Sequence, residues 1–146
     1  MKRSFPAIAS LLVLVVIMAV ACGPKTGGNT STGTTGKAIK TVTIDNLTAT
    51  LSSSTGQLKR GNQEVMLAFT DSSGKAVDVG AASLNFRMPA MGSMAEMNEG
   101  VTFTTTSTPG LYRGKVDIEA AGEWQAQLAY EGPAGKGKTT FSVTAQ

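Results

Sequence analysis

The chain has 146 residues, with 13 basic and 10 acidic side chains, one cysteine and no histidine. This composition excludes a conventional zinc site, a blue-copper site, a haem site and a Ser-His-Asp or Cys-His nucleophile. The near balance of charge, with no basic patch and no helix-turn-helix pattern, disfavours nucleic-acid binding.

Residues 1–21 have the layout of a secretory signal peptide. Lys2 and Arg3 form a positive n-region, and an apolar run broken only by one serine covers residues 7–20. Small residues then lead to Cys22, as in bacterial lipoproteins whose cleavage leaves a lipidated cysteine at the N-terminus. An uncleaved anchor helix is less favoured, because the run is near the lower limit of about 17 residues for crossing a bilayer. We therefore expect a lipid-anchored protein on the extracytoplasmic side of a bacterial membrane, with an inert Cys22 as the alternative.

Residues 22–38 are rich in Gly, Ser and Thr and contain no recurring apolar residue, which predicts a flexible tether. The remaining residues, 39–146, are predicted to form one domain of ordinary size. Because Cys22 is the only cysteine, no disulfide can form within the chain, and the domain depends on its hydrophobic core. We expect it to fold alone, as a monomer.

From residue 39 onward, apolar and polar residues alternate in short runs, with turn signals at residues 71–74, 108–110 and 132–135. No segment has a convincing helical pattern longer than a turn or two. The alternation predicts an all-β fold, an immunoglobulin-like antiparallel β-sandwich of about seven strands. The residues expected to point inward are Val65, Leu67, Phe69, Leu84, Phe86, Tyr112, Val116, Ile118, Trp124, Leu128, Phe141 and Val143.

Four of the seven methionines occur at a spacing of three, and they are Met88, Met91, Met94 and Met97. Pro89 and Gly92 lie among them and disfavour a regular helix, so we expect an irregular loop. Thioether sulfur is a soft, neutral ligand that selects Cu(I) and has no proton to lose on binding. The loop is therefore a candidate Cu(I) site, chiefly through the first three methionines, with Met97 as a fourth or alternate ligand.

The same methionines could instead form an apolar packing stripe or an adaptable surface that docks onto a membrane protein partner. Trp124 is predicted to anchor the core. Its alternative role is a cation–π cap, with the indole ring facing a bound monovalent ion. Met66 is predicted to pack or to lie on the surface. Glu96 and Glu99 are predicted to be solvated rather than to form an acid–base pair.

Three blocks, Phe86–Gly92, Pro109–Tyr112 and Gly122–Gln125, resemble in that order the YtkA-like/FixH-like domain. The resemblance covers residues 39–146, and its most specific part is the Met-Pro-x-Met block followed by the Gly-x-Tyr and Gly-x-Trp anchors. It implies an extracytoplasmic immunoglobulin-like domain with a metal-site candidate at Met88, Met91 and Met94. Loops of this family often carry histidine beside methionine, so the lack of histidine speaks against Cu(II) and leaves Cu(I) open.

Together, the resemblance and the residues lead us to expect a non-enzymatic protein for copper buffering, copper efflux or copper delivery to an oxidase. The expected partner is a copper exporter or an oxidase-assembly protein. The extracytoplasmic location supports thioethers as ligands, because thiols tend to oxidise there.

If the signal is of the lipoprotein type, the mature chain begins at a lipid-modified Cys22. Mass spectrometry of the native protein should find this modification, and Cys22→Ala should abolish it. Recovery of an intact Met1 in the mature, membrane-bound protein would contradict the lipoprotein assignment.

Overall fold

The computed structural model describes residues 36–146, so the predicted signal peptide, Cys22 and nearly all of the predicted tether lie outside the described residues. Eight strands and no helix occur in the described part. They are β1 (Lys37–Ile44), β2 (Leu47–Ser53), β3 (Gly61–Thr70), β4 (Ala81–Met88), β5 (Met97–Thr105), β6 (Leu111–Ile118), β7 (Gly122–Gly132) and β8 (Gly135–Ala145). The all-β prediction is confirmed.

The structure has eight strands, one more than the expected number of about seven. Asp45 and Asn46 form a tight turn that separates β1 from β2. Asp45 has a φ of 54°, in the left-handed region that Asp and Asn tolerate better than most residues.

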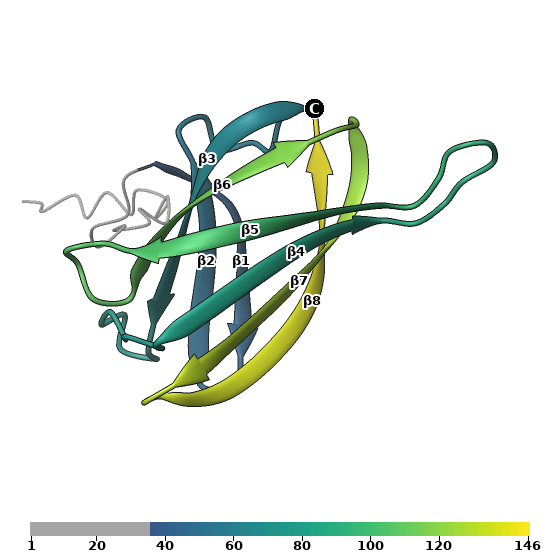
Figure 1. Cartoon of the computed structure of the whole chain (residues 1–146). Helices are drawn as coiled ribbons and strands as arrows, with labels where there is room; N and C mark the ends of the chain where they lie inside the picture. The colour runs from purple at the N-terminus through teal and green to yellow at the C-terminus, as the bar shows by residue number, and fades with distance from the viewer. Residues whose placement is uncertain (1–35) are drawn as a thin grey trace, which may run out of the picture.

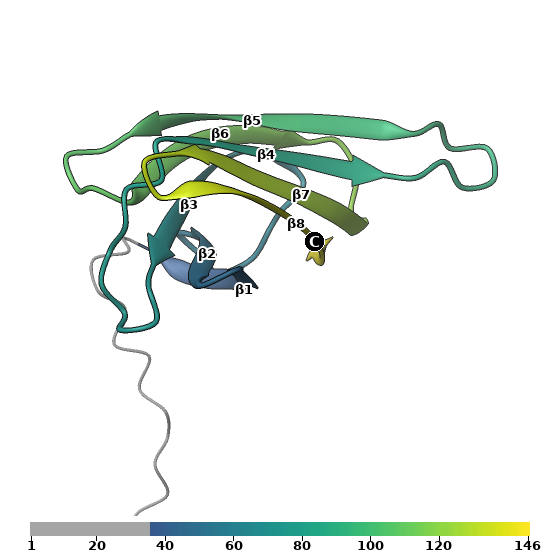
Figure 2. The same cartoon turned by 90° about the horizontal axis from the view of Figure 1, so that it is seen from below.

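All strand pairs are antiparallel, in the order β1-β2-β3-β6-β5-β4-β7-β8. β5 changes partner along its length: Met97–Val101 pair with β4, and Thr102–Thr105 pair with β6. The sheet therefore bends over on itself, and β1, β2 and β3 face the layer that contains β4, β7 and β8 (Figures 1 and 2). This arrangement is a β-sandwich made from one continuous sheet, and its immunoglobulin-like character stays a prediction.

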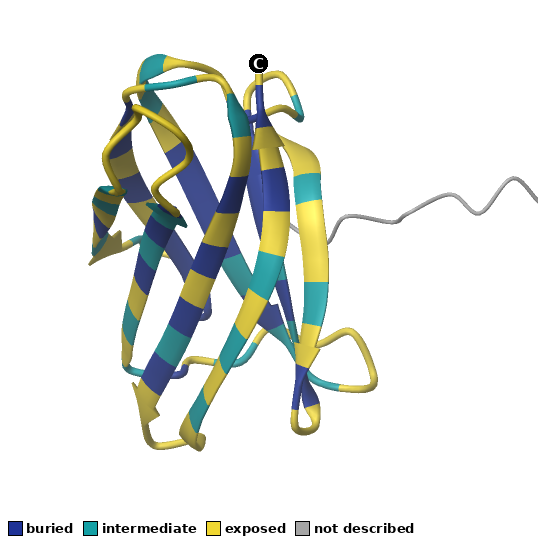
Figure 3. Ribbon diagram, turned by 90° about the vertical axis from the view of Figure 1, so that its right-hand side faces the viewer, coloured by how far each residue is buried: buried dark blue, intermediate teal, exposed yellow. Residues whose placement is uncertain are grey.

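Burial alternates along the strands as the sequence pattern requires (Figure 3). All twelve residues expected to point inward are buried except Phe141, which is half-buried. Two further core residues, Leu58 and Val79, are fully buried although they lie in connections between strands. They have no periodic neighbours, so alternation alone could not identify them.

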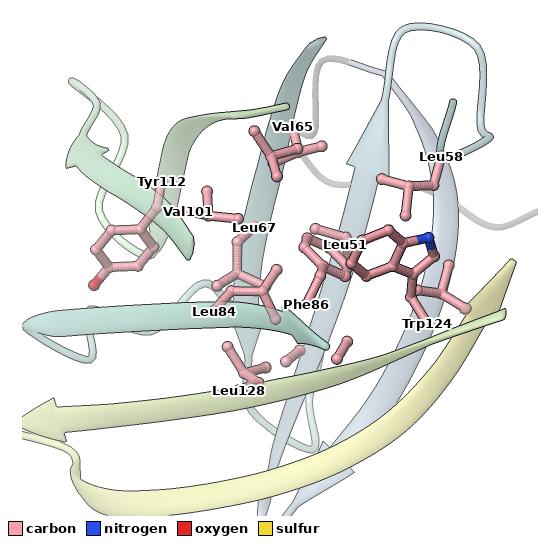
Figure 4. Close-up of a cluster of buried hydrophobic side chains, with 14 of the residues drawn as sticks. Leu51, Leu58, Val65, Leu67, Leu84, Phe86, Val101, Tyr112, Trp124 and Leu128 are labelled. Atoms are coloured by element: carbon pink, nitrogen blue, oxygen red, sulfur yellow. The ribbon is translucent and has the colours of Figure 1, made fainter. Parts of the chain in front are cut away.

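Trp124 and Tyr112 anchor the core through both their rings and their polar atoms. Trp124 is fully buried among core residues that include Leu51 and Leu58 (Figure 4), and its indole N–H donates to the Ala120 carbonyl at 3.0 Å. The Tyr112 hydroxyl donates to the Asp78 carboxylate at 2.9 Å and accepts from the Val79 amide at 3.1 Å. These bonds satisfy the polar ends of side chains that are otherwise apolar.

The burial of Trp124 predicts a large loss of stability when its ring is removed. Trp124→Ala should lower the free energy of unfolding by about 3–5 kcal/mol, the usual range for deleting a core aromatic. Trp124→Phe, which keeps a ring but loses the donor to Ala120, should cost less. Chemical denaturation followed by circular dichroism measures both variants. A loss below about 1 kcal/mol for the alanine variant would contradict the anchoring role.

Candidate functional site: the methionine hairpin

The segment that carries the four methionines is a projecting β-hairpin, not the irregular loop that was expected. The pairing of β4 with β5 ends at Met88 opposite Met97. In the same register, an isolated antiparallel bridge joins Met91 and Met94. The Met91 amide donates to the Met94 carbonyl at 3.1 Å, and the Met94 amide donates to the Met91 carbonyl at 2.9 Å. The ladder is interrupted between the two pairs, where Pro89 has no N–H to donate. The hairpin extends beyond the rest of the sandwich (Figure 1).

Gly92 and Ser93 form the two-residue turn at the hairpin tip. Gly92 has a φ of 57°, whereas Ser93 is not among the described residues with positive φ. Glycine with positive φ at the first central position is the pattern of a type II′ turn, which suits the twist of a hairpin. The turn therefore fixes Met91 and Met94 as direct neighbours across the ribbon.

The structure thus arranges the four methionines as two cross-strand pairs. Residues directly opposite each other in an antiparallel ribbon have Cβ atoms about 4.5–5.5 Å apart, so the side chains of each pair can meet. The environments of the pairs differ. Met88 is 4% exposed and Met97 is half-buried, whereas Met91 is 64% and Met94 is 46% exposed. We call Met88 and Met97, which lie nearer the sandwich, the proximal pair, and Met91 and Met94 the tip pair.

Met88 belongs to the hydrophobic core. A methyl group added to Gly122 would lie 3.1 Å from the Met88 Cε, so glycine leaves room for this side chain. The register of β4 with β7 ends at Arg87–Gln125, and one further step sets Met88 beside Trp124 on the inner face. Trp124 therefore lies on the side of the proximal pair and not of the tip pair. Its core role is confirmed, and its role as a cation–π cap stays a prediction.

A polar cluster holds the opposite face of the hairpin base. The Arg87 guanidinium donates to Glu96 at 2.7 Å, and the Asn98 amide donates to the other Glu96 oxygen at 3.0 Å. The hydrogen bond from Arg87, and to a smaller extent the one from Asn98, lower the pKa of Glu96 to about 2. The interaction with Glu96 in turn raises the pKa of Arg87. Arg87 in β4 lies directly opposite Asn98 in β5. The cluster therefore joins the two strands where the projecting segment begins.

Glu99 lies on the other side of β5 from Glu96. It is half-buried, on the face that carries Met97 and Val101 toward the core. Burial raises the pKa of Glu99, and repulsion from Glu119 and Asp117 adds to this effect. The two glutamates therefore do not form a carboxylate pair, and a cation near the base would meet a negative local potential.

Among residues 36–146, no group of three or more His, Cys, Asp or Glu side chains could hold a metal ion. The thioethers of the hairpin are therefore the soft donors that the described chain gathers in one place. Met66 is not one of them, because it is buried in β3, paired between β2 and β6. The spacing of three indicated this segment as the candidate site, and the strand register shows which methionines lie opposite each other.

The fold and the site define a small β-sandwich whose candidate ligands are collected on one projecting hairpin. A family model described as YtkA-like matches residues 41–129, which include the hairpin and Trp124. The chain belongs to the YtkA-like family; its likeness to FixH stays a prediction. Neither the curated proteins nor the solved structures contain a match to this chain. Within the described residues, no helix is long and apolar enough to cross a membrane.

The polar cluster at the base predicts an unusually acidic titration of Glu96. Its pKa is about 2 in the folded protein against an ordinary 4.5, so the ion pair stabilises the fold above pH 4.5 and is lost as pH falls through about 2. Carbon-13 NMR of the Glu96 carboxyl should show this midpoint, and Arg87→Gln should raise it.

Arg113→Gln is the matched control, since it removes the other ion pair, the one to Glu64 at 3.5 Å. It should leave the Glu96 midpoint in place. An ordinary Glu96 midpoint in the unsubstituted protein would show that the cluster does not persist in solution.

Proposed function

We propose that this protein is a lipid-anchored extracytoplasmic copper-binding protein that holds Cu(I) through the thioethers of its projecting hairpin. The observation that carries the proposal is the concentration of four methionines, in two facing pairs, on a segment that extends from the sandwich. Methionine normally fills gaps in cores. Two of these four are instead the exposed large hydrophobic residues of the described chain, where packing does not explain them.

The chemistry of the donor set supports Cu(I) over other ions. Thioethers are soft and neutral and suit a soft monovalent ion, whereas hard divalent ions prefer oxygen ligands. The chain has no histidine, and Cys22 is the residue that we expect to carry lipid. The negative potential around Glu99 favours an approaching cation at the base of the hairpin.

We propose a role in binding rather than catalysis. Glu96 is engaged by Arg87 and Asn98, and Glu99 faces the opposite side of β5, so the two carboxylates cannot share one substrate. A site that binds Cu(I) on thioethers suits copper buffering, efflux or delivery to an oxidase. An exporter or an oxidase-assembly protein in the same membrane is the partner that this role requires.

A second candidate function is a non-catalytic interaction module whose hairpin docks onto a membrane protein partner. The exposure of Met91 and Met94 supports it, since methionine side chains adapt to varied partner surfaces. The affinity of the purified protein for Cu(I), measured against a competing chelator, separates the two functions. Strong retention supports copper binding, and no detectable affinity supports docking.

Replacing Met88, Met91, Met94 and Met97 together by leucine should abolish Cu(I) binding while the fold survives. Leucine keeps the apolar volume, and such swaps typically cost under about 1.5 kcal/mol at a packed site. Only Met88 is fully packed here, so most of the cost should arise there. Chelator competition gives the affinity, and thermal unfolding gives the stability.

The unsubstituted protein should bind Cu(I) with an affinity that varies little between mildly acidic and neutral pH, because a thioether has no proton to release. A cap by Trp124 would make its fluorescence fall on Cu(I) addition in this protein but not in the leucine variant. Met66→Leu is a matched control that changes a buried methionine in β3 and should leave the affinity unchanged. Unchanged affinity in the fourfold variant would eliminate the hairpin as the site.

A further inference from the structure

We infer that the tip pair, Met91 and Met94, is the position where copper enters and leaves, and that a partner protein completes the coordination there with a sulfur ligand of its own. This inference rests on the proposed copper function and divides the hairpin into a fixed base and an exchanging tip. It follows from the difference between the two pairs in burial, in backbone support and in charge.

The proximal pair, Met88 and Met97, is poorly suited to rapid exchange of copper. Met88 is 4% exposed and packs in the core beside Gly122, so its sulfur can reach an ion only if the side chain leaves its packing. Bringing an ion inward instead would place its charge among the apolar core residues around Met88, which is costly even with Glu99 on the same face of β5. The opposite face is held by the Arg87–Glu96 ion pair and by Asn98, so the strands at this level are fixed.

The tip pair has the opposite properties. Met91 and Met94 are 64% and 46% exposed, so their thioethers can turn toward an ion without loss of core packing. Their backbones exchange two hydrogen bonds, at 3.1 and 2.9 Å, which keep the two side chains opposite each other. Two thioethers are a small donor set for a soft ion, so a further sulfur ligand from a partner would add to them.

The surface of the tip identifies the chemistry of the partner. Residues 88–95 carry no charged side chain, and the nearest charge along the chain, Glu96, is already paired with Arg87. Charged partner groups would lose hydration against this surface without gaining an ion pair. The fitting partner is therefore an uncharged protein surface that presents a thioether. As that sulfur binds the ion, a Met91 or Met94 thioether leaves it, so that copper changes protein without being released to water.

Two double variants separate the tip from the base. Met91→Leu with Met94→Leu removes the tip pair, and Met88→Leu with Met97→Leu removes the proximal pair. Met66→Leu, in β3 and outside the hairpin, is the matched control. Cu(I) is added below one equivalent, without oxygen, to protein labelled with carbon-13 in the methionine methyl groups. The Met91 and Met94 methyl signals should shift before the Met88 signal does.

Transfer is then measured by stopped flow, from the Cu(I)-loaded protein to a synthetic peptide that carries two methionines and no charge. The tip variant should transfer copper at least about tenfold more slowly than the unsubstituted protein, or fail to retain copper at all. The variant of Met88 and Met97 should be slowed less than the tip variant, and Met66→Leu should stay within about twofold. A tip variant with an unchanged transfer rate, or a Met88 signal that shifts first, would overturn the exchange role while leaving copper binding intact. Absence of Cu(I) affinity in the unsubstituted protein would instead remove the proposed function, and the exchange role with it.

Discussion

The register between β4 and β5 is the constraint on which the site depends. With Met88 opposite Met97, each step outward uses one residue on each side, so Met91 must meet Met94 across a two-residue turn. A slip of one residue would move every side chain of one strand to the other face. Gly92 protects this register, because its positive φ fits the tight turn that closes the tip.

The change of partner by β5 provides a firm support for this register. Its second half is held by β6 and its first half by β4, so the base of the hairpin is anchored where the sheet bends from one layer to the other. On one face of the ribbon Met88 packs in the core, and on the other Glu96 joins Arg87 and Asn98. Beyond this level, the hydrogen bonds that join the two strands of the hairpin are the pair between Met91 and Met94, whose side chains are exposed.

Much of the fold could be predicted from period-two alternation, since eleven of the twelve expected inward residues are buried in the core. The expected number of about seven strands is one below the eight observed, and the two-residue turn of Asp45 and Asn46 separates the first two strands. The arrangement of the methionines could not be predicted from the sequence, for a different reason. A spacing of three suggests convergence on a loop or a helix, but in a ribbon it places neighbours along the chain on opposite faces. Which residues then meet depends on pairing between strands, which no local pattern specifies.

Packing and electrostatics act in opposite directions on an ion at this hairpin, and their magnitudes favour the tip. Glu99, with Asp117 and Glu119 nearby, attracts a cation toward the base. A unit charge at roughly 10 Å in water contributes only about 0.4 kcal/mol, and salt reduces it further. Withdrawing the buried Met88 side chain from the core forfeits about 1.5–3 kcal/mol of burial. In the proposed function, the acidic groups would draw copper toward the hairpin but would not offset the cost of opening the core. We therefore expect the ion to be held by the exposed thioethers of the tip.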